Sequence, residues 1–173
     1  MNERKGIVTF GGKPVTLVGP ELKVGERAPD FTLTGNELQP VRLEDFRNRI
    51  LIILTLPSLD TPVCDLETRR FNSEAEKLGA EVAVLAVSMD LPFAQKRWCG
   101  AAGVKNVLTA SDHRDGTFGT AYGVLIKEFR LLARTVFVVD RGGIIRYIQL
   151  VPEAGKEPDY GSVLAAVQNL KKE

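Results

Sequence analysis

The residues of this chain that are most able to do chemistry are its two cysteines, Cys64 and Cys99. Two cysteines are too few for a disulfide scaffold or for a zinc site built from cysteine alone. A single histidine, His113, also argues against a mixed Cys/His metal site. The 35 positions between the cysteines exclude a Cys-x-x-Cys motif. The number of cysteines alone leaves two interpretations open. The two thiols are either inert and pack as small hydrophobic side chains, or they form a reactive pair.

The residues before Cys64 predict that its thiol lies in the first turn of a helix. Thr61 suits the N-cap position, and Pro62 suits the first helical position, where a missing N–H costs nothing. Cys64 is then the third helical residue, where free backbone N–H groups and the helix dipole stabilise a thiolate. Asp60 and Asp65 flank the site and oppose a thiolate, so a cation has to come from elsewhere in the chain. A purely structural helix start, with Cys64 following by chance, fits these residues equally well.

A strand–helix–strand unit would position this turn at the edge of a sheet. Ile50–Thr55 is a continuous apolar run, typical of a strand buried on both faces, and Val82–Val87 has the same character. Between them, Thr61–Leu78 has helical composition and is followed by Gly79, a suitable helix stop. Such a unit predicts parallel strands with a right-handed crossover. It also places Cys64 beyond the carboxyl end of a strand, where open α/β sheets bind ligands.

The other elements complete an α/β domain with a mixed sheet. Glycine turns predict two β-hairpins, the first from Val8–Phe10 and Val15–Val18, and the second from Ala133–Val139 and Ile144–Leu150. Further elements are predicted at Ala28–Leu33, Val41–Leu43, Pro92–Ala102, Thr117–Tyr122, and in a last helix with Tyr160, Val163, Leu164 and Val167 on one face. We therefore expect one domain over residues 1–173, with residues 1–20 as a hairpin extension.

The composition argues against several classes of partner. Hydrophobic residues make up 44% and charged residues 26% of the chain, as in folded globular proteins. A net charge of +1 provides no general attraction for nucleic acid or for anionic membranes. The apolar run Ile50–Leu56 is too short to cross a bilayer, and Met1–Lys5 leads into no secretory signal. We expect a cytoplasmic protein without nucleic-acid or membrane partners.

The residues around Cys64 carry a specific family resemblance. Pro57-x-x-x-Thr61-x-x-Cys64 matches the active-site pattern of the peroxiredoxins, and the full segment Pro57-Ser58-Leu59-Asp60-Thr61-Pro62-Val63-Cys64 resembles their thiol peroxidase subfamily of atypical two-cysteine enzymes. Segments with the same resemblance follow in order along the chain at Gly12–Gly19, Asp90–Gly100, Ala121–Gly123, Arg134–Asp140 and Glu157–Tyr160. The resemblance implies a thioredoxin-like fold, with a central mixed sheet flanked by helices.

The resemblance also implies an activity and a set of site residues. The activity is the reduction of hydrogen peroxide and organic hydroperoxides in antioxidant defence, with thioredoxin as reductant, no cofactor or metal, and a homodimeric assembly. By position, the residues with implied roles are Cys64 (peroxidatic), Cys99 (resolving), Thr61 and Arg134 (contacts to substrate and thiolate), Pro57 (shielding of the pocket) and Val63, which with Cys64 offers backbone N–H donors.

These roles make chemical sense together. The thiolate attacks the terminal peroxide oxygen, and the rigid guanidinium of Arg134 stabilises the charge that develops on the oxygens. Thr61 aligns the attack, and the product is a sulfenic acid on Cys64, which Cys99 converts to a disulfide. Because a disulfide needs Cα atoms within ~7 Å, we expect the turn around Cys64 and the segment Trp98–Cys99 to unwind in each cycle. Trp98 itself is expected to pack rather than to contact substrate.

Three alternatives compete with this interpretation. A thiol sensor would pass its oxidation to a partner protein, and an observed turnover with thioredoxin would argue against this alternative. A binding module with incidental thiols would show no unusual reactivity at Cys64. A peroxiredoxin of the bacterioferritin-comigratory type is closer, but its resolving cysteine is expected much nearer to Cys64 than Cys99 is.

Overall fold

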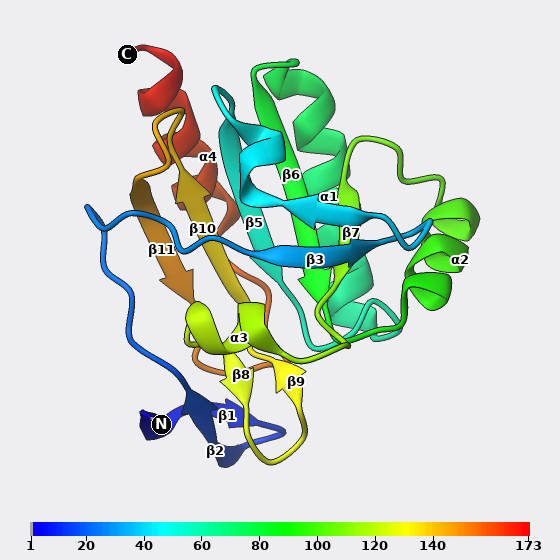
Figure 1. Cartoon of the computed structure of the whole chain (residues 1–173), viewed down its shortest axis with the longest axis vertical. Helices are drawn as coiled ribbons and strands as arrows, with labels where there is room; N and C mark the ends of the chain where they lie inside the picture. The colour runs from blue at the N-terminus through cyan, green and yellow to red at the C-terminus, as the bar shows by residue number, and fades with distance from the viewer. Residues whose placement is uncertain (1) are drawn as a thin grey trace.

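The computed structural model describes residues 2–173, which form strands and helices around a seven-stranded sheet (Figure 1). The strands are β1 (Glu3–Phe10), β2 (Lys13–Val18), β3 (Thr32–Gly35), β4 (Pro40–Arg42), β5 (Ile50–Thr55), β6 (Val82–Ser88), β7 (Leu108–Ser111), β8 (Leu125–Ile126), β9 (Leu131–Leu132), β10 (Thr135–Val139) and β11 (Ile145–Leu150). The helices are α1 (Pro62–Leu78), α2 (Pro92–Ala102), α3 (Thr117–Ala121) and α4 (Tyr160–Lys171), with a 3₁₀ turn at Leu43–Phe46.

The large sheet is mixed, as the sequence predicts. Its strand order is β11-β10-β5-β6-β7-β3-β4. Strand β5 pairs in parallel with β6, which is the predicted strand–helix–strand unit with α1 as the crossover, and it pairs antiparallel with β10. The second predicted hairpin is β10 with β11, and the predicted segments Ala28–Leu33 and Val41–Leu43 overlap with β3 and β4, which pair antiparallel.

The central strand is apolar throughout because both of its faces are covered. On one face, Leu51 and Ile53 pack into a cluster that also contains aromatic side chains. On the other face, Ile50, Ile52 and Leu54 pack into a second cluster under α1 and α4. In Figure 1 these two helices lie together behind the sheet, and α2 lies at its far edge. Because Cys64 belongs to the second cluster, its side chain faces the sheet from α1.

A second, four-stranded sheet departs from the sequence prediction of one mixed sheet. The N-terminal hairpin forms as predicted, but β2 continues into β8 and β9, in the order β1-β2-β8-β9. Strands β8 and β9 have two residues each, so they carry no period-2 pattern that the sequence could reveal. Figure 1 shows this sheet at the lower end of the molecule, beneath α3.

Two glycines allow the hairpin to approach the rest of the chain closely. Gly19 has φ +108° and Gly123 has φ +68°, and a Cβ added to either would lie 1.9 Å from a backbone oxygen, Thr120 O and Pro20 O respectively. Only glycine tolerates both that conformation and that contact. The docking of the hairpin therefore depends on these two residues. Separately, among residues 2–173 no helix is long and apolar enough to cross a membrane.

Candidate active site

The fold brings together Cys64 and Arg134, which are far apart in the sequence. Cys64 lies in the first turn of α1, and Arg134 directly precedes β10, the strand beside β5. The guanidinium NH2 group lies 3.2 Å from the Cys64 sulfur, and the two residues are 0% and 1% exposed. The cation that the flanking aspartates made necessary is therefore in contact with the thiol.

Arg134 makes three further hydrogen bonds. Its Nε and NH2 groups donate to the carbonyl oxygen of Ala154, at 3.1 and 2.7 Å, and its NH1 group pairs with the carboxylate of Glu67. Contacts on three sides hold the planar guanidinium in one orientation. One N–H group is thereby directed at the sulfur.

Glu67 is a member of this cluster that the sequence analysis missed. It lies one helical turn after Cys64, is 0% exposed, and its Oε1 atom has no hydrogen-bond partner among the described residues. Burial raises the pKa of Glu67 from 4.5 to about 7, although the Arg134 cation acts to lower it. Burial acts to lower the pKa of Arg134, but Glu67 and the Cys64 sulfur outweigh it and raise that pKa above its ordinary value.

The helical pattern of α1 contained the signal for Glu67. Cys64, Glu67, Phe71, Ala75 and Leu78 follow the spacing of one helix face, and all five are buried. A carboxyl group on a buried stripe has to be paired or protonated, so this glutamate needed either a buried cation or a bound proton.

The start of α1 agrees with the prediction in position but not in every contact. Thr61 is the N-cap and Pro62 the first helical residue. The Thr61 hydroxyl, however, donates to Ser58 O at 2.9 Å and does not cap the helix. The backbone extends through the loop here, so the side chain turns back to the preceding residues. The N–H groups of Val63 and Cys64 lie in the first turn, where helices have no internal acceptors for them.

The carboxylate of Asp90 fixes the loop before α1. The Asp90 carboxylate accepts hydrogen bonds from Ser58 Oγ at 2.7 Å, from the Leu59 N–H at 2.9 Å and from Ser88 Oγ at 2.8 Å. Pro57, which opens this loop, is buried. This network links the loop to the segment that begins α2.

The flanking aspartates do not face the sulfur. Asp60 is exposed to solvent. Asp65 accepts hydrogen bonds from Trp98 Nε1 at 2.8 Å and from Arg69 Nε at 2.9 Å, on the side of α1 towards α2. Their unfavourable effect on a thiolate is thus smaller than the sequence suggested.

Cys99 occupies a separate position. Both cysteines are free thiols, and Cys99 is half-buried on α2 with its sulfur 3.4 Å from Thr109 Oγ1 of β7. Strands β5 and β6 lie between β10 and β7. At ~4.8 Å per strand, β7, which carries Thr109, lies about 14 Å from β10, which Arg134 directly precedes. The structure therefore brings Cys64, Arg134 and Thr61 to one end of α1 and leaves Cys99 outside that cluster.

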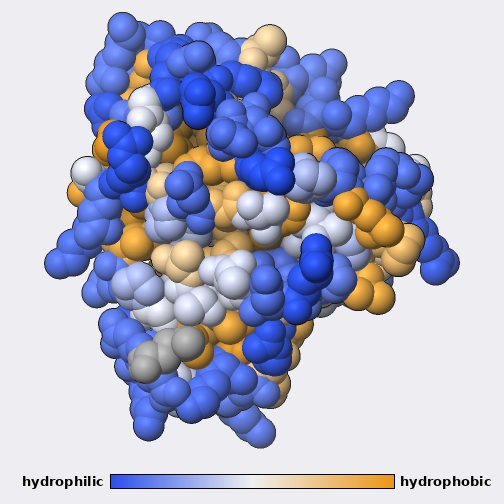
Figure 2. Space-filling view, viewed as in Figure 1, coloured by the Kyte–Doolittle hydropathy of each residue, from blue (hydrophilic) through white to orange (hydrophobic). Residues whose placement is uncertain are grey.

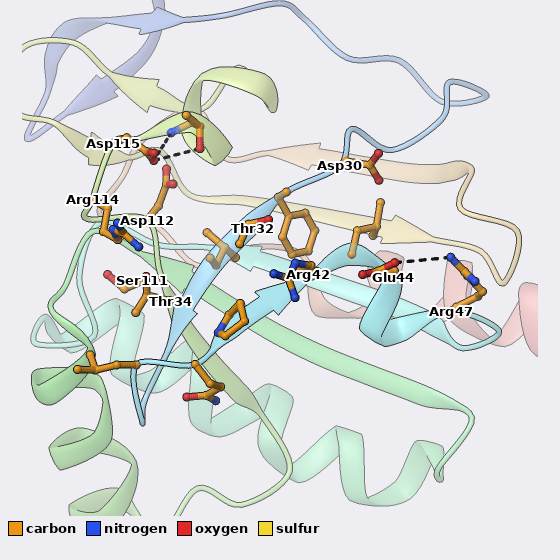
Figure 3. Close-up of a pocket in the computed structure, with 17 residues that line it drawn as sticks. Asp30, Thr32, Thr34, Arg42, Glu44, Arg47, Ser111, Asp112, Arg114 and Asp115 are labelled. Carbon is orange, nitrogen blue, oxygen red and sulfur yellow. Dashed lines mark hydrogen bonds and ion pairs between the residues drawn. The ribbon is translucent and has the colours of Figure 1, made fainter.

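A well-formed cavity lies away from this site. It measures about 750 Å³ and lies over β3, β4 and the 111–117 loop, and neither cysteine lines it. Figure 3 shows that acidic, basic and uncharged polar side chains surround it, and that Arg47 is paired with Glu44. Within residues 2–173, no three His, Cys, Asp or Glu side chains are arranged to hold a metal ion.

Comparisons with known proteins agree on one family. The sequence model of the Redoxin family matches residues 23–164. The chain is 54% identical to a thiol peroxidase of Bacillus subtilis over 165 residues, which are 95% of this chain and 98% of that protein. It is 50% identical to a thiol peroxidase of Staphylococcus aureus over 163 residues, or 94% and 98% of the two chains.

Solved structures show the same similarity. A peroxiredoxin-like protein from Aquifex aeolicus superposes with a TM-score of 0.88 and 46% identity, covering 94% of this chain and 96% of the other. A thiol peroxidase from Chromobacterium violaceum shares the fold, with a TM-score of 0.86 at 21% identity over 95% and 97% of the chains. The expected thioredoxin-like fold is confirmed. This chain belongs to the Redoxin family and, within it, to the thiol peroxidases, which are peroxiredoxin-type oxidoreductases.

Proposed function

We propose that the chain reduces hydrogen peroxide and organic hydroperoxides through a sulfenic acid on Cys64 and a disulfide between Cys64 and Cys99, which thioredoxin then reduces. The observation that carries this proposal is the 3.2 Å contact between the buried guanidinium of Arg134 and the Cys64 sulfur. A buried thiol with a fixed cation and free N–H donors beside it is arranged for nucleophilic attack.

In the first step the Cys64 thiolate attacks the terminal oxygen of the hydroperoxide. The sulfur–oxygen bond forms as the oxygen–oxygen bond breaks, and the proton of the hydroperoxide moves to the leaving oxygen, which departs as water or an alcohol. The sulfenate that remains takes a proton from solvent and becomes the sulfenic acid. Arg134 and the N–H groups of Val63 and Cys64 stabilise charge on the peroxide oxygens. Thr61 accepts a hydrogen bond from the peroxide O–H through a lone pair of its hydroxyl oxygen, which stays available while the hydroxyl donates to Ser58 O, and Pro57 keeps water from the pocket.

In the second step the Cys99 thiol attacks the sulfenic sulfur, a disulfide forms and water leaves. The α1 start and the Cys99 segment have to move together for this, since the two sulfurs are held at different strands. An external dithiol then exchanges with the disulfide and restores both thiols. A reducing cytoplasm with thioredoxin is the compartment that supports such a cycle.

We also propose that the protein acts as a homodimer through the helices around the site. Three large hydrophobic side chains are exposed near the starts of these helices. They are Leu66 of α1 (54% exposed), Leu91, the N-cap residue of α2 (55%), and Phe93 of α2 (66%). Figure 2 shows hydrophobic residues gathered at the edge of the molecule where α2 lies. Sedimentation equilibrium of the wild type and of Phe93→Glu tests this, because a charge in the contact should produce monomers while a monomeric wild type contradicts it.

The activity test is a coupled assay with NADPH, thioredoxin reductase, thioredoxin and cumene hydroperoxide. The wild type should oxidise NADPH continuously, whereas Cys64→Ser should be inactive. Cys99→Ser should consume one equivalent of hydroperoxide and then stop. Continuous turnover by Cys64→Ser contradicts the nucleophile assignment, and wild-type turnover by Cys99→Ser contradicts the resolving role. Rapid oxidation without turnover by thioredoxin favours the sensor alternative.

A further inference from the structure

Three side chains connect α1 to α2 beside the two cysteines. Trp98 Nε1 donates to Asp65 Oδ1 at 2.8 Å, and Arg69 Nε donates to the other oxygen of Asp65 at 2.9 Å. Arg69 also lies over the Trp98 ring, 5.9 Å from its centroid, and its NH1 group reaches Ala102 O at 3.3 Å. We refer to Asp65, Arg69 and Trp98 as the clasp. Its members at positions 65 and 98 are the sequence neighbours of Cys64 and Cys99.

The buried residues of helix α2 lie at its start, whereas its second half is only partly buried. Its fully buried residues are Pro92 and Gln95, both in its first half. Its second half carries Gly100 and ends before Gly103, and glycine lowers helix stability by ~1 kcal/mol relative to alanine. The half of α2 that carries Cys99 is therefore held by the clasp, by the packing of Trp98 and Ala102 on the second core cluster, and by the contact between Cys99 and Thr109.

The geometry of a helix makes the clasp incompatible with a disulfide between Cys64 and Cys99. Successive residues point about 100° apart around a helix axis. Cys64 points into the core at Arg134, while Asp65 points at Trp98. Turning the Cys64 sulfur towards α2 carries Asp65 away from the indole. Turning Cys99 towards α1 moves Trp98 in the same way.

We propose that the clasp sets the rate of disulfide formation, with Trp98 as a positioning residue that plays no part in the attack on peroxide; this rests on the proposed function. The affected step is the attack of the Cys99 thiol on the Cys64 sulfenic acid, in which the sulfur–sulfur bond forms and water leaves. The clasp has to open before that attack. It leaves the first step unaffected because none of its contacts reaches the Cys64 sulfur or Arg134.

The clasp also governs sensitivity to excess hydroperoxide. While it stays closed, the sulfenic acid can attack a second hydroperoxide, giving a sulfinic acid and an alcohol. Disulfide formation and this second oxidation compete for the same intermediate. A looser clasp should therefore protect Cys64 from overoxidation.

The first test uses the wild type, in which Trp98 is the only tryptophan of the chain. Stopped-flow fluorescence after one equivalent of cumene hydroperoxide should show an emission change at the rate of disulfide formation, measured in parallel by acid quench and mass spectrometry. Cys99→Ser should lack this phase. Equal emission from the dithiol and disulfide forms would overturn the proposal, because the indole would then keep its surroundings.

The second test uses two variants with matched controls. Trp98→Phe keeps an aromatic ring but removes the donor, and it should form the disulfide roughly tenfold faster, a change of ~1.4 kcal/mol. Arg69→Ala should act in the same direction by about threefold. The controls are Tyr160→Phe, which removes the hydrogen bond to Glu157 on the α4 side, and Arg70→Ala, which removes an arginine stacked on Tyr160. Both controls should leave the rate unchanged.

The outcomes separate this inference from the proposed function. Sulfenic acid formation, trapped with dimedone in the Cys99→Ser background, should be equal within about twofold with and without Trp98→Phe. The hydroperoxide concentration that gives half sulfinic acid should rise in Trp98→Phe. Unchanged disulfide rates in both clasp variants, with normal sulfenic acid formation, would overturn the clasp and keep the peroxidase. A wild type that forms no disulfide would overturn both.

Discussion

Arg134 donates to the sulfur of a cysteine that lies 70 positions earlier in the chain, across a distance of 3.2 Å. Both groups are excluded from solvent, so the charge of the guanidinium acts on the sulfur with little screening. The same guanidinium is fixed by Ala154 O and Glu67, and it therefore needs no reorganisation when a peroxide enters.

Arg134→Lys tests the value of that fixed fork. A lysine keeps the charge but offers one flexible ammonium, which cannot bind Glu67, Ala154 O and the sulfur in the same geometry. We expect the second-order rate constant with cumene hydroperoxide to fall by about 10²-fold or more. Stopped-flow mixing under single-turnover conditions measures it. A rate within a few-fold of the wild type would show that charge alone is sufficient.

Thr61 should matter through its hydroxyl group. Thr61→Val is nearly isosteric, so it removes the hydrogen bonding while keeping the packing at the N-cap, and it should lower the same rate constant by roughly 10²-fold. Thr61→Ser retains the hydroxyl and should stay within about tenfold of the wild type. Because the Thr61 hydroxyl donates to Ser58 O in this structure, equal activity of the valine variant would assign it to the loop alone.

Glu67 should make folding stability depend on pH. Its pKa is raised from 4.5 to about 7 by burial, so between these values the folded protein holds a proton that the unfolded chain has lost. The stability that this proton contributes is complete below pH 4.5 and is lost as the pH rises through about 7, in total about 3 kcal/mol. Glu67→Gln carries no titrating group and should lack this loss.

Urea unfolding of both proteins from pH 4.5 to 8 measures the difference. Relative to the wild type, Glu67→Gln should gain stability as the pH increases. Glu76→Gln, on the exposed side of the same helix, is the control and should follow the wild type. A constant difference between Glu67→Gln and the wild type at every pH would contradict a proton held at Glu67.

Gly19 should be far less tolerant of substitution than other glycines with positive φ. Gly19→Ala adds a Cβ 1.9 Å from Thr120 O and should destabilise the fold by about 3 kcal/mol or more. Gly12→Ala is the matched control, because Gly12 has φ +80° with no atom within 4 Å, so its cost should be only the ~1–2 kcal/mol of backbone strain. Thermal unfolding of both variants measures the loss of folding stability in each. Equal losses of stability would contradict a steric clash at Gly19 and would assign the whole cost to the backbone conformation.

The sequence predicts the elements around the site because their patterns are local. The apolar run of β5, the Thr61-Pro62 start of α1 and the glycine after Leu78 each specify structure within a few residues, and their bounds agree with the structure. The four-stranded sheet escaped prediction because β8 and β9 are short and their pairing with β2 is non-local.

The site itself was only partly readable from the sequence. Local residues place Cys64 in a helix turn, but nothing near Arg134 indicates that it meets this sulfur, and only the family resemblance pointed to it. Glu67 was missed although its spacing from Cys64 puts it on the buried face. The orientation of Asp65 towards Trp98 depends on how α1 and α2 pack, which the sequence does not specify locally.

The central claim is that Cys64 and Cys99 together carry out peroxide reduction. The most direct measurement is intact mass and peptide mapping of the reduced protein after one equivalent of cumene hydroperoxide. The account predicts rapid loss of both thiols and one linked peptide that joins Cys64 to Cys99. Survival of both thiols would contradict the account, and a trapped sulfenic acid on Cys64 without the linked peptide would contradict the role of Cys99.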